Sequence, residues 1–362
     1  MKTKSKRLAN IELLRIIAMM MVVILHYLGK GGLLPEVGLK MGIEGYVAWT
    51  METLSNVAVN VYVLISGYFL VESEFKFGKV LRLVLQVLFY TILITVFTCA
   101  VGIFNVKDLG IYHIIMQIFP FQMEHYWFVT AYIAMYMLSP ILAAGVKNIS
   151  KKQLQVVIAV FVFFMCIEKS IFPVRLTIDE KGYEALWLVC IFLIAAYIRL
   201  YGIKFLQKKS TSLLLYLGGC ALTFLENLAI SVIYAKTGKL SHMLGSPYHY
   251  NHIFVLLASI GFFMLFVNIN LPENKVAQFI CKISPYTLGV YLLHEHLYIR
   301  YLWPKWLGAH EVEGPVVLIV KTILAAVIVF IVGSMVDYIR SLLFKVGSNL
   351  IYGKKVGKTL SK

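Results

Sequence analysis

Residues 11–29 read IELLRIIAMMMVVILHYLG, and Glu12, Arg15 and His26 are the only charged or histidine residues in this run. A helix needs about 20 predominantly apolar residues to cross the hydrocarbon core of a bilayer, so the run predicts a transmembrane helix. The whole chain shares this character, because 60% of its 362 residues are hydrophobic and its mean hydropathy is +0.81. Soluble domains are only about half apolar. The sequence therefore predicts an integral membrane protein.

Similar apolar runs recur along the chain and predict an all-α bundle of about ten transmembrane helices. The fourth and ninth runs are interrupted by polar residues, and either could be a re-entrant helix. We expect one transmembrane domain over residues 1–345 and a basic cytoplasmic tail over 346–362. The ten predicted spans lie near residues 11–29, 46–70, 81–104, 126–146, 154–171, 184–201, 211–233, 252–269, 286–303 and 316–339.

Basic residues are distributed unevenly between the two sides of this predicted bundle. Lys147, Lys151 and Lys152 share one short loop, and the tail after the tenth span is also rich in lysine. Loops on the opposite side carry only scattered basic residues. Because cytoplasmic loops are enriched in Lys and Arg, we expect both termini in the cytoplasm. The net charge of +16 is then explained by contact with anionic membrane lipids, and nucleic acid is not an expected partner.

The three polar residues of the first run share one helix face. Arg15 and His26 are eleven residues apart, which is three turns plus about 20°, and Glu12 lies within about 60° of the same line. Ionisable groups inside a span are costly, so this face must point into the bundle or a wet cavity. Arg15 could instead snorkel while paired with Glu12, and His26 could lie at the interface. The functional alternative makes His26 a general base.

Lys79 and Arg82 lie three residues apart at the start of the third span, on one face of a helix. One interpretation is simple anchoring at the cytoplasmic surface. The other is a phosphate-binding pair for a nucleotide-like donor.

Histidine and aromatic residues mark three other span ends. His125 and Trp127 open the fourth span, and Trp127 could belong to an interfacial aromatic belt or to a substrate site. Asn251 lies in the polar, aromatic loop SPYHYNH (residues 246–252), which could contact a sugar or the membrane interface.

His294 in the ninth span shares a predicted polar and aromatic face with Tyr291 and Tyr298. His294 and His296 would point about 200° apart on a helix, so they could not bind one metal unless the helix unwinds. We therefore expect no bound metal.

These motifs occur together in an order that resembles acyltransferase family 3, the bacterial ten-span enzymes that acylate surface polysaccharides. Glu12 stands where the family usually has Asp, and Lys79 where it usually has Arg. The resemblance covers essentially the whole chain. It rests on Arg15 with His26, the Ser-Gly-Tyr-Phe of 66–69, the Lys79–Arg82 pair, the His-Tyr-Trp-Phe of 125–128 and the SPYTLGVYLLH of 284–294.

The resemblance implies a bacterial plasma-membrane O-acetyltransferase that uses acetyl-CoA as co-substrate and binds no resident cofactor. The acceptor it implies is a hydroxyl of a cell-surface or lipid-linked glycan. His26 would be the base or a transient acyl carrier, Arg15 would orient the donor or stabilise the oxyanion, and Glu12 would hold Arg15. The other implied contacts are Lys79 and Arg82 for the CoA phosphates and His125, Trp127, Asn251 and His294 for substrate.

The main alternative is a polytopic transporter of a polysaccharide precursor, which would also need polar groups inside its spans. A transporter would not need a reactive histidine aligned with a CoA-binding face. The unrelated membrane-bound O-acyltransferase type is a further alternative, but no order of motifs favours it.

Overall fold

The computed structural model describes residues 7–108, 110–121, 123, 125–172 and 181–360, with side chains up to residue 350. These residues form helices and no strand. Six 3₁₀ turns connect them. The α-helices are α1 (Ala9–Lys30), α2 (Ile43–Ser55), α3 (Ala58–Leu70), α4 (Phe77–Ala100), α5 (Ile111–Ile118), α6 (Trp127–Asn148), α7 (Lys151–Val162), α8 (Glu168–Ile171), α9 (Ala185–Tyr201), α10 (Lys209–Thr237), α11 (Ile253–Val267), α12 (Lys275–Ile283), α13 (Thr287–His294), α14 (Trp303–Trp306) and α15 (Pro315–Leu360).

Among the described residues, nine helical segments are long and apolar enough to cross a membrane. Their outer faces carry many exposed Leu, Ile, Val and Phe side chains, for example on α4, α10 and α15, as lipid-facing helices require. The predicted span 184–201 corresponds to α9, which has 17 residues and is mostly buried because α3, α6 and α7 surround it. The protein is therefore an all-helical, multi-pass membrane protein.

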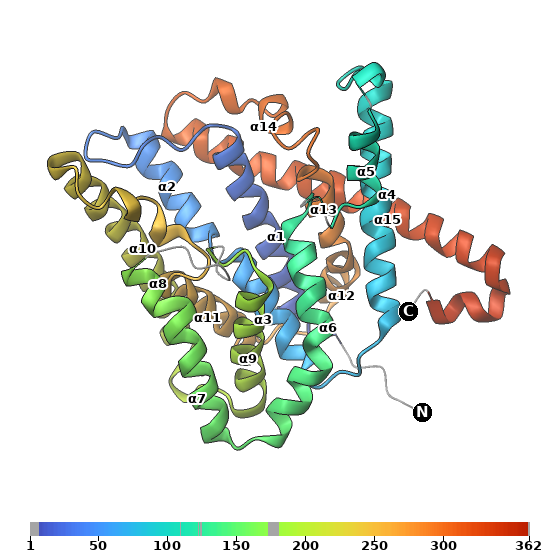
Figure 1. Cartoon of the computed structure of the whole chain (residues 1–362), viewed down its shortest axis with the longest axis horizontal. Helices are drawn as coiled ribbons and strands as arrows, with labels where there is room; N and C mark the ends of the chain where they lie inside the picture. The colour runs from blue at the N-terminus through green and yellow to red at the C-terminus, as the bar shows by residue number, and fades with distance from the viewer. Residues whose placement is uncertain (1–6, 109, 122, 124, 173–180, 361–362) are drawn as a thin grey trace.

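Helix α1 lies at the centre of the bundle, with α7, α10 and α11 on one side of it and α4 and α5 on the other (Figure 1). It packs against α2, α3, α12, α13 and α15. Its apolar residues are buried among these neighbours, and its polar residues follow one stripe. The first predicted span thus occupies the position from which its polar face can contribute to an internal site.

Two of the apolar segments are interrupted, and the first interruption separates two helices that both pack against α1. The second predicted span, 46–70, consists of α2 and α3, separated at Asn56 and Val57. The π-helical turn Phe163–Ile167 similarly interrupts the helical segment between α7 and α8. Short helices that end inside the bundle expose backbone and polar side chains to a cavity, which membrane proteins tolerate only where protein or water surrounds them.

The predicted ninth span, 286–303, is wrong in its bounds. The apolar segment runs from Lys275 to His294 and is interrupted by a 3₁₀ turn at Ser284–Tyr286, where Pro285 lacks a backbone donor. The helix ends at His294, and the chain then turns towards α14. Tyr298 therefore does not share a helix face with His294, contrary to the sequence-based expectation.

Close packing between α13 and α15 fixes the position of this short helix. A Cβ added to Gly333 would lie 2.6 Å from the Cα of Val290, so glycine is needed for this approach. Asp337 of α15 is fully buried and accepts hydrogen bonds from Gln86 (2.8 Å), Tyr90 (3.1 Å) and Arg340 (2.7 Å). These hydrogen bonds compensate the buried charge of Asp337 and join α15 to α4. Helix α15 then continues through the region predicted as a tail, to Leu360.

Candidate active site

A cavity of about 800 Å³ lies inside the bundle beside α1. Arg15, Met19, Val22, His26 and Lys30 line it, so one stripe of α1 faces the cavity along its whole length. The predicted shared face of Arg15 and His26 is thus present and faces the cavity. Further polar and aromatic lining residues are Glu52, Asn56, Tyr62, Ser66, Trp127, Phe128, Tyr132, Lys181, Tyr183, Tyr248, His249, Tyr250, Ser284, Thr287, Tyr291, Glu295, Arg300 and Tyr301.

At one end of the cavity, Arg15 is held by a buried carboxylate. Its guanidinium lies 3.0 Å from Glu12, whose same oxygen accepts a 2.5 Å hydrogen bond from the Ser284 hydroxyl. The hydroxyl of Tyr62 donates to the backbone carbonyl of Arg15 at 2.8 Å. Glu12 does not line the cavity itself. It fixes the guanidinium, so that the donors of Arg15 not used by Glu12 remain for a ligand.

At the other end, His26 belongs to a chain of hydrogen bonds with defined proton positions. His294 Nδ1 lies 2.6 Å from the carbonyl oxygen of Val290, which can only accept, so His294 carries its proton on Nδ1. Its Nε2 is then an acceptor and lies 2.9 Å from His26 Nδ1. His26 must therefore donate from Nδ1, which leaves the lone pair of its Nε2 free.

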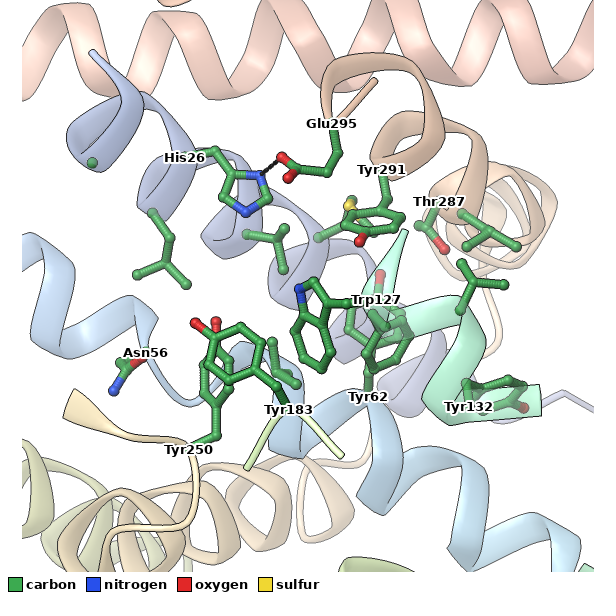
Figure 2. A pocket seen from close by; sticks show the side chains of 18 of the residues that line it. His26, Asn56, Tyr62, Trp127, Tyr132, Tyr183, Tyr250, Thr287, Tyr291 and Glu295 are labelled. Atoms are coloured by element: carbon green, nitrogen blue, oxygen red, sulfur yellow. Dashed lines mark ion pairs between the residues drawn. The ribbon is translucent and has the colours of Figure 1, made fainter. Parts of the chain in front are cut away.

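Glu295 completes this group. One of its oxygens lies 3.2 Å from His26 Nδ1, as the dashed line in Figure 2 shows, and the second ring nitrogen of His26 points into the cavity. Lys30 contacts the same carboxylate, and Arg300 lies 3.7 Å from its other oxygen. His294 thus fixes the tautomer of His26, Glu295 places a negative charge beside Nδ1, and two cations hold Glu295, an arrangement suited to proton abstraction at Nε2.

His26, His294 and Glu295 also bring their possible ligand atoms within 4.8 Å of one another, a spacing that a metal ion could use. A bound cation would, however, lie beside Lys30 and Arg300, which already pair with Glu295. It would also displace the hydrogen bond between the two histidines. We therefore interpret the group as a hydrogen-bonded relay.

The structure places the other predicted site residues at different distances from this cavity. Trp127 lines it, and His294 contacts His26. Lys79 and Arg82 lie near the start of α4 and do not line it, although the next residue, Leu83, does. The Lys79 ammonium lies 6.0 Å from the ring of Tyr136. The basic pair therefore lies on the same helix as one lining residue but does not itself line the cavity.

His125 and Asn251, both predicted to contact substrate, lie behind the cavity wall. His125 is buried against His296, with ring centroids 4.5 Å apart, and it accepts a 3.4 Å hydrogen bond from the Leu297 backbone. Burial, and secondarily the charge of Arg300, lower the pKa of His125 to about 4. Asn251 is buried, and its neighbours His249 and Tyr250 line the cavity instead. Both side chains are therefore packed inside the protein and do not line the cavity.

Glu295 and Arg300 were missed because a continuous helix over 286–303 would have pointed them in different directions. Lys30 was missed because the first predicted span ended at residue 29, whereas α1 continues to Lys30. The end of α13 at His294 turns Glu295 towards α1. A carboxylate inside a predicted span was the available signal. Glu52 and Tyr183 were also missed, since nothing in the local pattern shows that their segments meet. Tyr250 lies in the loop 246–252, which the sequence indicated as a possible sugar contact through Asn251.

The fold and the cavity define a multi-pass membrane protein with a buried histidine relay suited to group transfer. A family model described as an acyltransferase domain, that of acyltransferase family 3, matches residues 8–335. The chain belongs to this acyltransferase family, and the resemblance predicted from the motifs is confirmed. No curated protein and no solved structure matches the chain significantly.

Proposed function

We propose that this protein transfers an acetyl group from acetyl-CoA to a hydroxyl of a cell-surface or lipid-linked glycan. The observation that carries the proposal is the free Nε2 of His26, which faces a cavity of about 800 Å³ and is backed by His294 and Glu295. Family membership supports acyl transfer. The acetyl donor and the glycan acceptor are the specific parts of our proposal.

The proposed reaction begins when His26 Nε2 accepts the proton of the acceptor hydroxyl. The hydroxyl oxygen attacks the thioester carbonyl carbon, the carbon–sulfur bond breaks, and the proton leaves with the CoA thiolate as a thiol. Glu295 stabilises the imidazolium that forms in between, because its carboxylate oxygen lies 3.2 Å from Nδ1. Lys30 and Arg300 supply positive charge at the end of the cavity where the oxyanion develops.

Arg15 is assigned to the donor. Eleven residues of helix separate it from His26, or roughly 16 Å along the axis, so it cannot reach a carbonyl that is held at His26. A donor entering at Arg15 must extend a long arm to His26, which suits the pantetheine arm of CoA. Lys79 and Arg82 near the start of α4 would then meet its phosphates. We place this end, and both termini, in the cytoplasm of a bacterial cell on the basis of the Lys and Arg distribution.

The test is His26→Gln in cells that carry the native glycan. Glutamine keeps a hydrogen-bonding side chain but cannot accept a proton, so we expect the acetyl content of the surface glycan to fall about 100-fold or more. Mass spectrometry of the extracted glycan measures it, with the amount of protein in the membrane as a control.

His310→Gln is the matched control, because His310 is exposed and lies outside the cavity. It should leave acetylation unchanged. Near-normal acetylation in the His26→Gln strain would remove His26 from the mechanism. A loss of exported glycan with normal acetylation of what remains would instead favour a transporter.

A further inference from the structure

Three aromatic side chains form a cluster on one wall of the cavity. The ring centroids of Trp127 and Tyr183 are 4.3 Å apart, and those of Tyr183 and Tyr250 are 4.9 Å apart. Trp127 and Tyr250 are nearly parallel, at 21° and 5.9 Å. We call these three residues the aromatic wall. They come from the start of α6 and from the loops before α9 and α11, and Figure 2 shows the three rings grouped below His26.

Buried hydrogen bonds hold the backbone of this wall. Asn60 donates to the Tyr250 carbonyl at 2.8 Å, and its own amide oxygen accepts from Trp187 at 3.0 Å. The Tyr250 backbone N–H donates to the Lys181 carbonyl at 3.1 Å. Gly182 has φ +86°, and a Cβ there would lie 2.8 Å from the backbone nitrogen of Asn251. These contacts hold the three rings in place before a ligand binds. The Tyr183 side chain remains 41% exposed, so a ligand can reach it.

A carboxylate without a partner lines the same cavity. Glu52 has a buried side-chain oxygen that makes no hydrogen bond, and no ion pair links it to another described residue. Asn56, four residues later, donates its amide to the Tyr248 carbonyl at 3.0 Å, which leaves its amide oxygen as an acceptor. Leaving a buried carboxylate oxygen unpaired is costly. The pattern of acceptors therefore calls for a ligand that donates hydrogen bonds.

We infer that the aromatic wall, Glu52 and Asn56 form the acceptor subsite and that they bind a sugar ring. The inference rests on the proposed function. The C–H face of a pyranose is apolar and stacks on aromatic rings, while its hydroxyls lie at the edge and donate to carboxylate and amide oxygens. Because the aromatic wall and His26 line the same cavity, a ring seated here can present a hydroxyl to His26 Nε2. The donor then enters from Arg15, so the two substrates approach His26 from different parts of the cavity.

The experiment uses membranes that contain the full chain, radiolabelled acetyl-CoA, and glycan extracted from a strain that lacks the gene. The concentration of each substrate is varied in turn. We expect Trp127→Ala and Glu52→Gln each to raise the KM for the glycan about tenfold, through loss of stacking and of a hydrogen bond to the sugar. The KM for acetyl-CoA should change less than about twofold, because neither residue lies on the donor path.

Matched controls are Glu44→Gln and Trp306→Ala, because both side chains are exposed and lie outside this cavity. Both should keep the wild-type KM for glycan. If Trp127→Ala does not accumulate, Trp127→Phe and Tyr183→Ala replace it, the first with a partial and the second with a full effect.

The possible failures are distinguishable. If the wild-type protein transfers no label to the glycan, the proposed function fails, and the subsite fails with it. If the wild type transfers label but Glu52→Gln and the wall variants keep its KM for glycan, the subsite alone is overturned. The subsite is also overturned if these variants raise the KM for acetyl-CoA instead, since the wall would then bind the donor.

Discussion

The two ends of the cavity are both built around a carboxylate that links α1 to the segment 284–295, but the carboxylates have different partners. Glu12 faces one cation, Arg15, and one hydroxyl, that of Ser284. Glu295 faces His26 and two cations, Lys30 and Arg300. The first arrangement is a closed, neutral pair that fixes a guanidinium for binding. The second leaves excess positive charge around a titratable ring, which suits a reaction that develops negative charge.

This difference predicts that variants at the His26 end lower kcat, whereas variants at the Arg15 end raise the KM for the donor. The predictions below test that division, beginning with the largest expected effect.

Glu295→Gln should lower kcat for acetyl transfer about 100-fold, because the neutral amide no longer stabilises the imidazolium of His26. The KM for acetyl-CoA should stay within about twofold of wild type. Initial rates with labelled acetyl-CoA measure both values, and Glu311→Gln serves as the control because Glu311 is exposed. The relay would be contradicted if the variant kept kcat within about threefold of wild type while remaining folded.

Arg15→Ala should raise the KM for acetyl-CoA about tenfold, through the loss of charge-assisted hydrogen bonds to the donor. The variant also leaves Glu12 without its cation, so its melting temperature in detergent must be measured alongside. Arg7→Ala is the matched control, because Arg7 is exposed, lies outside the cavity and donates a hydrogen bond to the Cys281 carbonyl. A fall in kcat with an unchanged KM for acetyl-CoA would place Arg15 at the reacting centre. It would contradict the division between donor binding at Arg15 and catalysis at His26.

Arg82→Ala should raise the KM for acetyl-CoA about fivefold, and Lys79→Ala about twofold. A guanidinium matches phosphate with two parallel donors, whereas an ammonium acts as a point charge. The KM for acetyl-CoA is measured for both variants in the same type of membrane preparation and at one ionic strength. The two values show which residue contributes more to donor binding. If neither variant changes the KM for acetyl-CoA, Lys79 and Arg82 do not bind the donor, and membrane anchoring is their remaining role.

The smallest effect concerns stability and pH. Burial lowers the pKa of His125 to about 4, below its ordinary value of 6.5, so the unfolded state binds more protons than the folded state between these values. Stability should therefore be highest above pH 6.5 and should fall as the pH drops towards 4. His125→Gln should flatten part of the decline in melting temperature between pH 7.5 and pH 5, compared with His310→Gln. An unchanged pH dependence would show that His125 does not contribute to it.

Much of the fold could be predicted because apolar runs of membrane length are local features of the sequence. The stripe formed by Arg15 and His26 was predictable for the same reason, since helix geometry fixes their relative direction. The span 286–303 was predicted with the wrong bounds, because hydropathy alone does not reveal that the segment extends back across Ser284 and Pro285 to Lys275 and that its last helix ends at His294. That error concealed the role of Glu295, whose direction depends on where α13 ends.

The sequence by itself determined that this is a helical membrane protein of acyltransferase family 3, with a polar stripe along its first helix. Only the tertiary structure decided which residues complete the stripe. His294 and Glu295 lie more than 260 positions from His26 in the chain, and the aromatic wall joins three separate segments. Helical periodicity acts over a few turns, whereas contacts between distant helices depend on close packing, such as that of Gly333 against Val290, which no local pattern specifies.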